Sequence, residues 1–426
     1  MREKPFRVLL AVLDAALLLA LLRGPRFFPD SASYLDGSLL RPPAYPLLLG
    51  LLRTLSHAHG LQALCLLQTA AVLAACAWLT LELRRRLSLG APSSLVLHLV
   101  LASPLLPLPV LTGSVGCAVL TEAFSYAGVL CVAALLLRAL AGGSARDERG
   151  FIALAAFLPL LRPQFLFLVP VVAAYVLLSL RGADARRRVV LPLFALALFL
   201  AGDLSGRLYH AARHRVSAAP SLLGAYLVTD SLYMDEGAPP AAALPAQAEV
   251  LVREAREQVA ARRLGASVRG AANASLASYF EQNYNLIYWG VVMPLFQRPF
   301  AHLPENERLV EADRLLGETG RGLLRAGWLR QLRLSAAAVG ARLPVYAALL
   351  LLAVLVLAGR RALEGDALCA WIALVTLANL CNHLLVGGLQ PVLHRYVFHT
   401  EILQWTALAL LLRDAFGRAR AGSESR

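Results

Sequence analysis

The feature that most constrains this chain is a series of apolar stretches, most of them close to the length that crosses a lipid bilayer. A spanning helix needs about 20 predominantly apolar residues. Hydrophobic residues make up 58% of the 426-residue sequence and charged residues 16%, whereas a soluble domain carries about 25% charged residues. The sequence therefore predicts an all-α, polytopic transmembrane helical bundle, and it excludes a cytosolic enzyme, a nucleic-acid module and a disordered chain.

About ten spans are expected, with both termini on the cytoplasmic side. The short segments between the spans alternate in arginine content, and arginine-rich segments tend to face the cytoplasm. This alternation also accounts for the formal net charge of +14 without a nucleic-acid partner. The predicted spans are residues 8–22, 61–81, 93–111, 117–137, 151–161, 164–180, 189–206, 343–359, 367–386 and 397–412.

The least regular part of this pattern surrounds Arg162 and Pro163. Residues 151–180 are few for two full spans and many for one. A single span would put the basic cluster Arg181–Arg188 on the outer side, against the charge bias. Two short spans are therefore expected, with terminal arginines whose long side chains reach the headgroups.

Two outer segments are long enough to have structure of their own. Residues 23–60 contain a leucine-rich run after a proline-rich start, which is typical of an interfacial helix. Residues 207–342 contain Glu249–Leu264, where acids and bases recur at helical spacing, so a mostly helical outer domain is expected. The predicted organisation is an N-terminal transmembrane module (1–206), an extracytoplasmic domain (207–342) and a C-terminal transmembrane module with a cytoplasmic tail (343–426).

The polar residues of the predicted spans gather at the outer ends, and only Asp14 lies nearer the middle of the membrane. Ionisable side chains are costly in a bilayer and usually line a cavity or pair with one another. A transport path needs polar groups at several depths, so the one-sided pattern favours a site for the headgroup of an amphiphilic substrate. The outer-end residues are Asp30, Ser31, Tyr34, Glu122, Arg162, Asp203, Asn379, Asn382, His383, His394, Arg395, Tyr396, His399 and Glu401.

Two motifs in the first outer segment resemble the N-terminal signature of GT-C-type membrane glycosyltransferases. Pro-Asp-Ser-Ala-Ser-Tyr at residues 29–34 precedes Arg-Pro-Pro-Ala-Tyr-Pro-Leu at residues 41–47. Leu-Thr-Glu at 120–122, Arg162-Pro163 and Arg395-Tyr396 are weaker matches. The group that the chain resembles most is the bacterial branch similar to dolichyl-phosphate-mannose–protein mannosyltransferases, and the similarity leaves the outer domain unmatched.

The resemblance implies transfer of a sugar from a polyprenyl-phosphate carrier to an acceptor hydroxyl on the outer face, usually with inversion. It also implies that Asp30 is the general base, although the family often has a second acid where this chain has Ser31. Such a reaction needs a carboxylate to take the hydroxyl proton and cations to stabilise the departing phosphate. Arginine can do the latter, so no metal and no cofactor beyond the lipid-linked donor substrate is expected.

Each candidate residue also has a purely structural interpretation. Asp30 is expected to be catalytic, but an acid in this position is also a common helix cap. Glu122 is expected to support the base or the acceptor, but an acid at a helix N-terminus is favoured by the helix dipole. The expected substrate-binding residues are Tyr34, Arg41, Tyr45, Arg162, His394, Arg395, Tyr396 and Glu401, which are also the residue types of interfacial belts and headgroup anchors.

His210 and His214 are spaced to place two metal ligands on one helix face. No third ligand accompanies them clearly in the sequence, so no metal site is predicted.

The sequence thus predicts a glycosyltransferase of a bacterial inner membrane whose active site is extracytoplasmic. Its partners would be the lipid bilayer, a polyprenyl-phosphate-linked sugar donor and an acceptor that is a glycolipid, a polysaccharide or a protein. The alternative is a polytopic transporter or flippase for a lipid-linked substrate, which predicts an internal repeat and helices broken near mid-membrane. A related transferase that moves a phospho-alcohol or an oligosaccharide block is equally compatible with the motifs.

Overall fold

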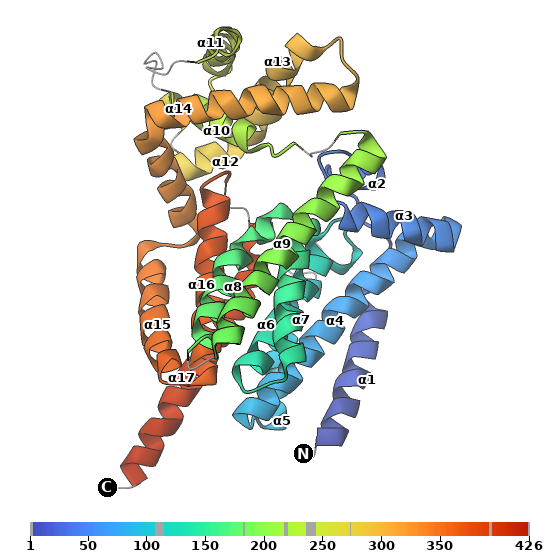
Figure 1. Cartoon of the computed structure of the whole chain (residues 1–426), viewed down its shortest axis with the longest axis vertical. Helices are drawn as coiled ribbons and strands as arrows, with labels where there is room; N and C mark the ends of the chain where they lie inside the picture. Colours follow the sequence, from blue (N-terminus) through green and yellow to red (C-terminus); the bar gives the residue numbers. More distant parts are fainter. Residues whose placement is uncertain are drawn as a thin grey trace. The chain divides into compact units, whose positions relative to one another are not determined.

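The computed structural model describes residues 3–106, 115–181, 184–216, 220–235, 244–272, 274–391 and 394–424. These residues form helices joined by short connections (Figure 1). No strand occurs within the described ranges, where a single β-bridge joins Arg26 to Ala118. The prediction of an all-α chain is confirmed.

Seventeen α-helices and eight shorter helical turns follow one another in the described chain. The α-helices are α1 (Glu3–Leu21), α2 (Ser31–Leu35), α3 (Ala44–Ser56), α4 (Gly60–Leu87), α5 (Ala91–Ala102), α6 (Glu122–Leu140), α7 (Ala145–Phe157), α8 (Leu168–Ser179), α9 (Ala185–His214), α10 (Leu223–Tyr233), α11 (Ala246–Ala261), α12 (Leu276–Ile287), α13 (Met293–Gln297), α14 (Glu305–Arg342), α15 (Val345–Leu363), α16 (Ala367–Gly387) and α17 (His394–Glu424). The short turns are η1 (His57–His59), η2 (Ser103–Leu105), η3 (Val115–Cys117), η4 (Leu158–Leu160), η5 (Pro163–Phe167), η6 (Ala266–Ala272), the π-helical η7 (Tyr288–Val292) and η8 (Arg298–Phe300).

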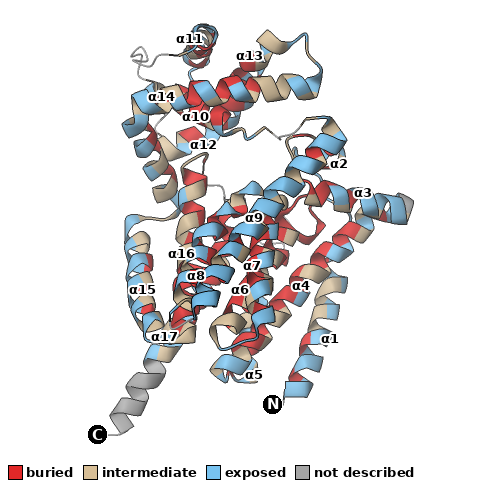
Figure 2. Cartoon of the chain, viewed as in Figure 1, coloured by how far each residue is buried: buried red, intermediate tan, exposed pale blue. Residues whose placement is uncertain are grey.

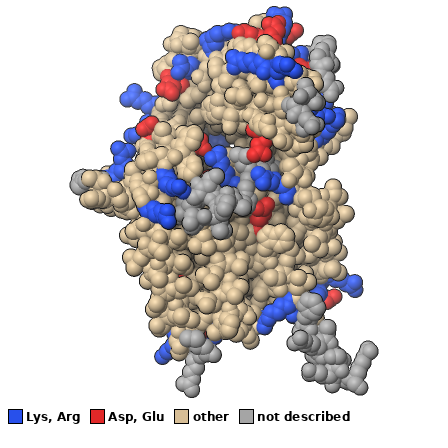
Figure 3. All heavy atoms as spheres, turned by 180° about the vertical axis from the view of Figure 1, so that it is seen from behind, with Lys and Arg blue, Asp and Glu red and all other residues tan. Residues whose placement is uncertain are grey.

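Five of these helices, α4, α6, α9, α15 and α16, are long and apolar enough to cross a bilayer. Two further apolar helical stretches, Ala91–Leu105 and Pro163–Ser179, are shorter. The membrane character of the chain is therefore confirmed at this coarser level, and the number of ten spans stays a prediction. On the face drawn in Figure 3, a broad band without Lys, Arg, Asp or Glu covers the lower part of the molecule, as a lipid-facing surface requires.

The structure corrects the start of one predicted span. The span expected from residue 117 begins as α6 at Glu122. The backbone of Arg26 donates to the carbonyl of Cys117 (2.8 Å) and accepts from the N–H of Val119 (2.9 Å), which holds residues 117–119 out of the helix. Helix α9, which contains the span expected at residues 189–206, extends to His214, because polar residues can continue a helix beyond an apolar stretch. Residues 107–111 of another predicted span lie outside the described residues.

The chain divides into two compact units, each made of segments that are distant in sequence. The first unit contains Met1–Ser205, Leu350–Asn382 and Val397–Arg426, and the second contains Gly206–Leu349 and His383–Tyr396.

In the first unit, α4 packs against α1, α3, α5 and α6, and α6 packs against α7. Buried residues follow α4, α6 and α16, whereas α9 and α15 are largely exposed (Figure 2). Two large polar side chains in this core bond to backbone carbonyls. The indole N–H of Trp371 in α16 donates to the carbonyl of Ala133 in α6 (2.8 Å), and the hydroxyl of Tyr126 in α6 donates to the carbonyl of Leu101 in α5 (2.6 Å). The first bond ties the late helix α16 to α6, and the second ties α6 to α5.

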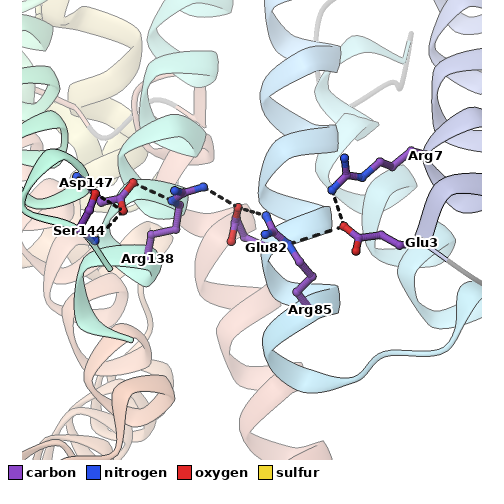
Figure 4. A network of polar contacts seen from close by, with 7 residues as sticks. All are labelled: Glu3, Arg7, Glu82, Arg85, Arg138, Ser144 and Asp147. Atoms are coloured by element: carbon purple, nitrogen blue, oxygen red, sulfur yellow. Dashed lines mark hydrogen bonds and ion pairs between the residues drawn. The ribbon is translucent and has the colours of Figure 1, made fainter. Parts of the chain in front are cut away.

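A network of charged side chains joins α1, α4, α6 and the start of α7 (Figure 4). Glu82 is 2% exposed and accepts from Arg85 and from Nη1 of Arg138 (3.3 Å). The Nε of Arg138 donates to Oδ1 of Asp147 (2.7 Å), and Arg85 also lies 4.0 Å from Glu3. The guanidinium of Arg138 therefore joins two carboxylates from different helices.

The second unit is built on the close approach of α10 and α14. A Cβ on Gly224 would lie 2.3 Å from the backbone nitrogen of Gly317, and one on Gly320 would lie 2.9 Å from the carbonyl oxygen of Gly224. Only glycine permits this distance. Farther along, α14 kinks at Gly327, whose backbone is not helical (φ −132°, ψ 28°). Apolar side chains of α10, α11, α12, η7 and α14 form the core of this unit.

We expect Arg138→Met to lower the free energy of unfolding by about 1–3 kcal/mol, because Glu82 and Asp147 would lose a shared cationic partner and Glu82 is buried. Chemical unfolding in detergent micelles measures this change. Arg360→Met is the matched control, since the Arg360–Glu364 pair is 83% and 66% exposed and such pairs contribute little. Equal stability of the two variants would contradict the role given to the network.

Candidate functional site

The residues singled out in the sequence fall in both units. Asp30, Tyr34, Arg41, Tyr45, Glu122, Arg162 and Glu401 belong to the first unit, whereas His394, Arg395 and Tyr396 belong to the second. The side chain of His394 lies outside the described part of the chain. The first six form two sets of contacts in this unit, one of Asp30, Arg41, Tyr34 and Tyr45 and one of Glu122 and Arg162, and the candidate site is built from them.

Backbone bonds bring two distant segments of the first unit together. Besides the pairing of Arg26 with residues 117–119, the buried hydroxyl of Ser31 donates to the carbonyl of Val119 (2.9 Å). Ser31 stands where the resembling family often has a second acid. An ionised carboxylate has no proton to donate, so the serine makes a bond that the acid could not. These bonds hold the loop that carries Asp30 against the segment that leads into Glu122.

Asp30 forms an ion pair with Arg41. It occupies the N-cap position of α2, but its side chain makes no capping bond, and Oδ1 accepts from Nη2 of Arg41 at 2.9 Å. The Nε of Arg41 donates to the hydroxyl of Ser33 (2.7 Å), and its guanidinium carbon lies 4.4 Å from the ring centre of Tyr34. The Asp30 side chain is 37% exposed, so a second molecule can reach its carboxylate.

Tyr45 links this loop to helix α4. It is fully buried, its ring meets the Tyr34 ring edge-on (5.2 Å between centres), and its hydroxyl donates to Oε1 of Gln68 in α4 (3.3 Å). The Gln68 amide in turn donates to the carbonyl of Ala118 (3.0 Å). Burial, with the negative charge of Glu122, raises the pKa of Tyr45. Tyr45 is therefore a neutral donor that positions its neighbours, and it is not open to a ligand.

Glu122 forms the second ion pair, with Arg162. Glu122 begins α6 and is 6% exposed, and its Oε1 lies 3.2 Å from Nη1 of Arg162. Arg162 precedes Pro163 and has an extended backbone (φ −160°, ψ 121°), which is the conformation that a following proline favours. Among the described residues, Oε2 of Glu122 has no hydrogen-bond partner.

A line of neutral polar side chains continues from the Arg162 loop into α16 and α17. The Gln164 amide donates to Oδ1 of Asn382 (2.9 Å), and the Asn382 amide donates to the hydroxyl of Thr400 (3.0 Å). His399 is fully buried and contacts the rings of Phe165 and Phe398. The sequence drew attention to Asn382 and His399 but not to Gln164 or Thr400. A single neutral polar residue in an apolar stretch does not stand out in a sequence, so no pattern indicated Gln164 or Thr400.

Thr400 also lines a narrow apolar cleft within the first unit. Helices α6, α8, α16 and α17 contribute its walls, and the open space is about 20 Å³. That is room for little more than one water molecule. A lipid chain does not fit into this cleft as it stands.

The other predicted site residues are described with their own surroundings. In the second unit, Nη2 of Arg395 donates to the hydroxyl of Tyr396 (2.8 Å), and the guanidinium carbon lies 4.9 Å from the Tyr396 ring centre. Glu401 is partly exposed on α17. His210 and His214 stack at 5.6 Å between ring centres. Within the described ranges, no group of three His, Cys, Asp or Glu side chains is arranged to hold a metal ion.

Comparisons with models of protein families, with curated proteins and with solved structures give no match to this chain. The functional conclusion therefore depends on the residues and their geometry.

We expect Arg162→Met to lower the free energy of unfolding by about 3 kcal/mol, because the buried Glu122 carboxylate would lose its ion-pair partner. The double variant Glu122→Gln/Arg162→Met removes both charges and should recover most of this loss. Unfolding of the wild type, both single variants and the double variant in detergent gives the coupling energy. If the double variant is no more stable than Arg162→Met, the stability that Arg162 contributes does not come from its pairing with Glu122.

Proposed function

We propose that the protein is a membrane glycosyltransferase that moves a sugar from a polyprenyl-phosphate carrier to an acceptor hydroxyl on the extracytoplasmic face. The observation that carries the proposal is the presence of two carboxylate–arginine pairs, Asp30–Arg41 and Glu122–Arg162, in one unit of apolar helices, where the loop of Asp30 is bonded to the segment before Glu122. Such a cluster combines a base with cations, and apolar helices are compatible with the bilayer in which a lipid carrier resides.

Asp30 is the proposed general base, because its carboxylate is the more exposed of the two. The acceptor oxygen forms a bond to the anomeric carbon of the sugar while its proton passes to Asp30. The bond from the anomeric carbon to the phosphate oxygen breaks, and polyprenyl phosphate leaves with the electron pair. Attack opposite the leaving group inverts the anomeric centre. Arg41 holds the Asp30 carboxylate in place through its contacts with Ser33 and Tyr34.

Arg162 and Arg41 are the proposed phosphate ligands. A guanidinium presents its N–H donors in a planar fork that matches phosphate oxygens, and Glu122 holds the Arg162 fork through Nη1. Charge-assisted bonds from arginine suit a phosphate oxygen that gains negative charge as the sugar departs. Glu122 keeps Arg162 oriented and shapes the acceptor side. Arg395 is a further expected cation, and Tyr34 a further donor to the substrate.

The arginine distribution supports an inner-membrane protein with both termini in the cytoplasm. Because arginines would neutralise the phosphate, the reaction is proposed to need no metal and no cofactor. The acceptor class, whether glycolipid, polysaccharide or protein, is addressed by the assays below.

One observation favours a second candidate, a transporter or flippase for a lipid-linked substrate. Asp14 of α1 has a partner in α5, where Nε2 of the fully buried His98 lies 2.8 Å from its Oδ1. An acid–histidine pair well inside a predicted span, with the histidine fully buried and the acid partly exposed, is the kind of group that proton-coupled transport uses. The two candidates therefore assign importance to different residues.

Turnover of polyprenyl-phosphate sugars by the full chain in lipid nanodiscs tests the proposal, with release of free polyprenyl phosphate as the readout. We expect release by the wild type and at least a hundredfold slower release by Asp30→Asn, because a general base contributes about 10²–10⁴-fold. Asp36→Asn is the matched control, since Asp36 is an exposed acid at the other end of α2. A chelator should leave the rate unchanged.

Full activity of Asp30→Asn would remove Asp30 from the role of base. Absence of turnover with every donor, together with lipid movement across the bilayer that His98→Gln abolishes, would favour the transporter.

A further inference from the structure

The second unit contains a buried cluster of polar aromatic side chains that the proposed reaction does not use. Tyr226 and Asp230 come from α10, Tyr284 from α12, Tyr288 from the π-helical turn η7, and Gln331 from α14. All five belong to the same compact unit. We refer to the first four residues as the tyrosine cluster.

The ring of Tyr288 stacks against both other tyrosine rings of this cluster. The Tyr288 ring stacks on Tyr226 (5.5 Å between centres, 30° between planes) and on Tyr284 (5.6 Å, 23°). Tyr284 and Tyr288 are buried, and Tyr226 is only partly buried. Tyr288 begins the π-helical turn, a distortion that occurs frequently at functional sites.

Asp230 brings an acid into this aromatic surrounding. It is 2% exposed, and its Oδ2 accepts from the Gln331 amide at 2.5 Å. Burial raises the pKa of Asp230 well above its ordinary value. The carboxyl group therefore keeps its proton to a higher pH than an ordinary aspartate, and in that protonated form it can donate a hydrogen bond as well as accept one.

The cluster has more hydrogen-bonding capacity than the described residues satisfy. Oδ1 of Asp230 and the hydroxyl of Tyr284 are buried without a hydrogen-bond partner among the described residues. Each such group costs free energy, and buried polar groups are nearly always paired in native proteins. The close packing of Gly224 on Gly317 limits how far α10 can shift to relieve this cost. A ligand with several hydroxyl groups would satisfy these atoms.

We propose that Tyr226, Asp230, Tyr284 and Tyr288 form a binding site for an uncharged sugar residue. Tyr284 and Tyr288 are buried, so the partly exposed ring of Tyr226 offers the flat apolar face to the C–H side of a pyranose, and the Tyr284 phenol and the Asp230 carboxyl group offer donors and acceptors to its hydroxyls. Because Tyr226 is partly exposed, the ligand would reach the cluster from the side on which Tyr226 lies. Assignment of this sugar to the acceptor glycan rests on the proposed function, whereas the binding of a sugar here does not.

The neutral state of Asp230 gives a stability test of its own. Between the ordinary pKa of an aspartate and the raised pKa of Asp230, the folded protein keeps the proton and the unfolded chain releases it. Stability in the wild type therefore falls as the pH rises through this window. Asp230→Asn cannot ionise, so the difference between its thermal midpoint and that of the wild type should grow in favour of the variant as the pH rises through this window. Tyr284 on α12 interacts electrostatically with Asp230 and also with Tyr226, Tyr288 and Tyr396, and Gln331 on α14, the hydrogen-bond partner of Asp230, is uncharged. Parallel pH profiles would contradict a neutral Asp230.

Saturation-transfer NMR on the full chain in nanodiscs tests the site directly, with the methyl α-pyranosides of mannose, glucose and galactose as probes. We expect at least one probe to bind the wild type, and Tyr284→Phe and Tyr226→Leu to bind it at least tenfold more weakly. Asp230→Asn keeps a donor and an acceptor and should bind as the wild type does, whereas Asp230→Ala should not. Tyr346→Phe, 77% exposed in the same unit, is the control.

The proposal is overturned if no probe binds the wild type, or if the Tyr284 and Tyr226 variants bind like the Tyr346 control. Asp30→Asn should retain glycoside binding. Binding that persists while no donor is ever turned over would contradict the proposed transferase and leave the sugar site standing.

Discussion

The backbone pairing of Arg26 with Cys117 and Val119 is the contact on which the candidate site depends. It joins the loop after α1 to the segment before α6. It also keeps the residues of that segment out of the helix, so that α6 begins at Glu122. The Ser31 bond to Val119 strengthens the same junction. Because two loops nearly a hundred residues apart are fixed to each other by their main chains, the side chains at positions 30 and 122 share one end of the first unit.

Electrostatics then divides the roles of the two acids. Glu122 is buried, and a buried carboxylate persists only with a cationic partner, which Arg162 supplies. Asp30 is paired with Arg41 but remains more than a third exposed, so it can meet a second molecule without breaking a buried pair. Tyr45, which is fully buried and bonded to Gln68, packs against Tyr34 beside the Asp30–Arg41 pair. This division is the physical basis for assigning base chemistry to Asp30 and orientation to Glu122.

Hydropathy was sufficient to predict the helical class and the membrane character, because apolar length reports directly on burial in lipid. It did not locate the start of α6 or the end of α9, since main-chain pairing and helix extension leave no hydropathy signal. The sequence also identified Asp14 without its partner, His98, which lies more than eighty residues away. The sequence did not reveal the tyrosine cluster, because Asp230, Tyr284 and the Asp230 partner Gln331 are single residues on three different helices. Only the packing of these helices brings them together.

The most direct test of the central claim is a cryo-EM structure of the full chain in nanodiscs with a non-transferable polyprenyl-phosphonate sugar. The account predicts the phosphonate within hydrogen-bond distance of the Arg41 or Arg162 guanidinium, with the sugar beside the Asp30 carboxylate. A lipid phosphonate bound instead beside Glu82 and Arg138, at the far ends of α4 and α6, or none bound at saturating concentration, would contradict it.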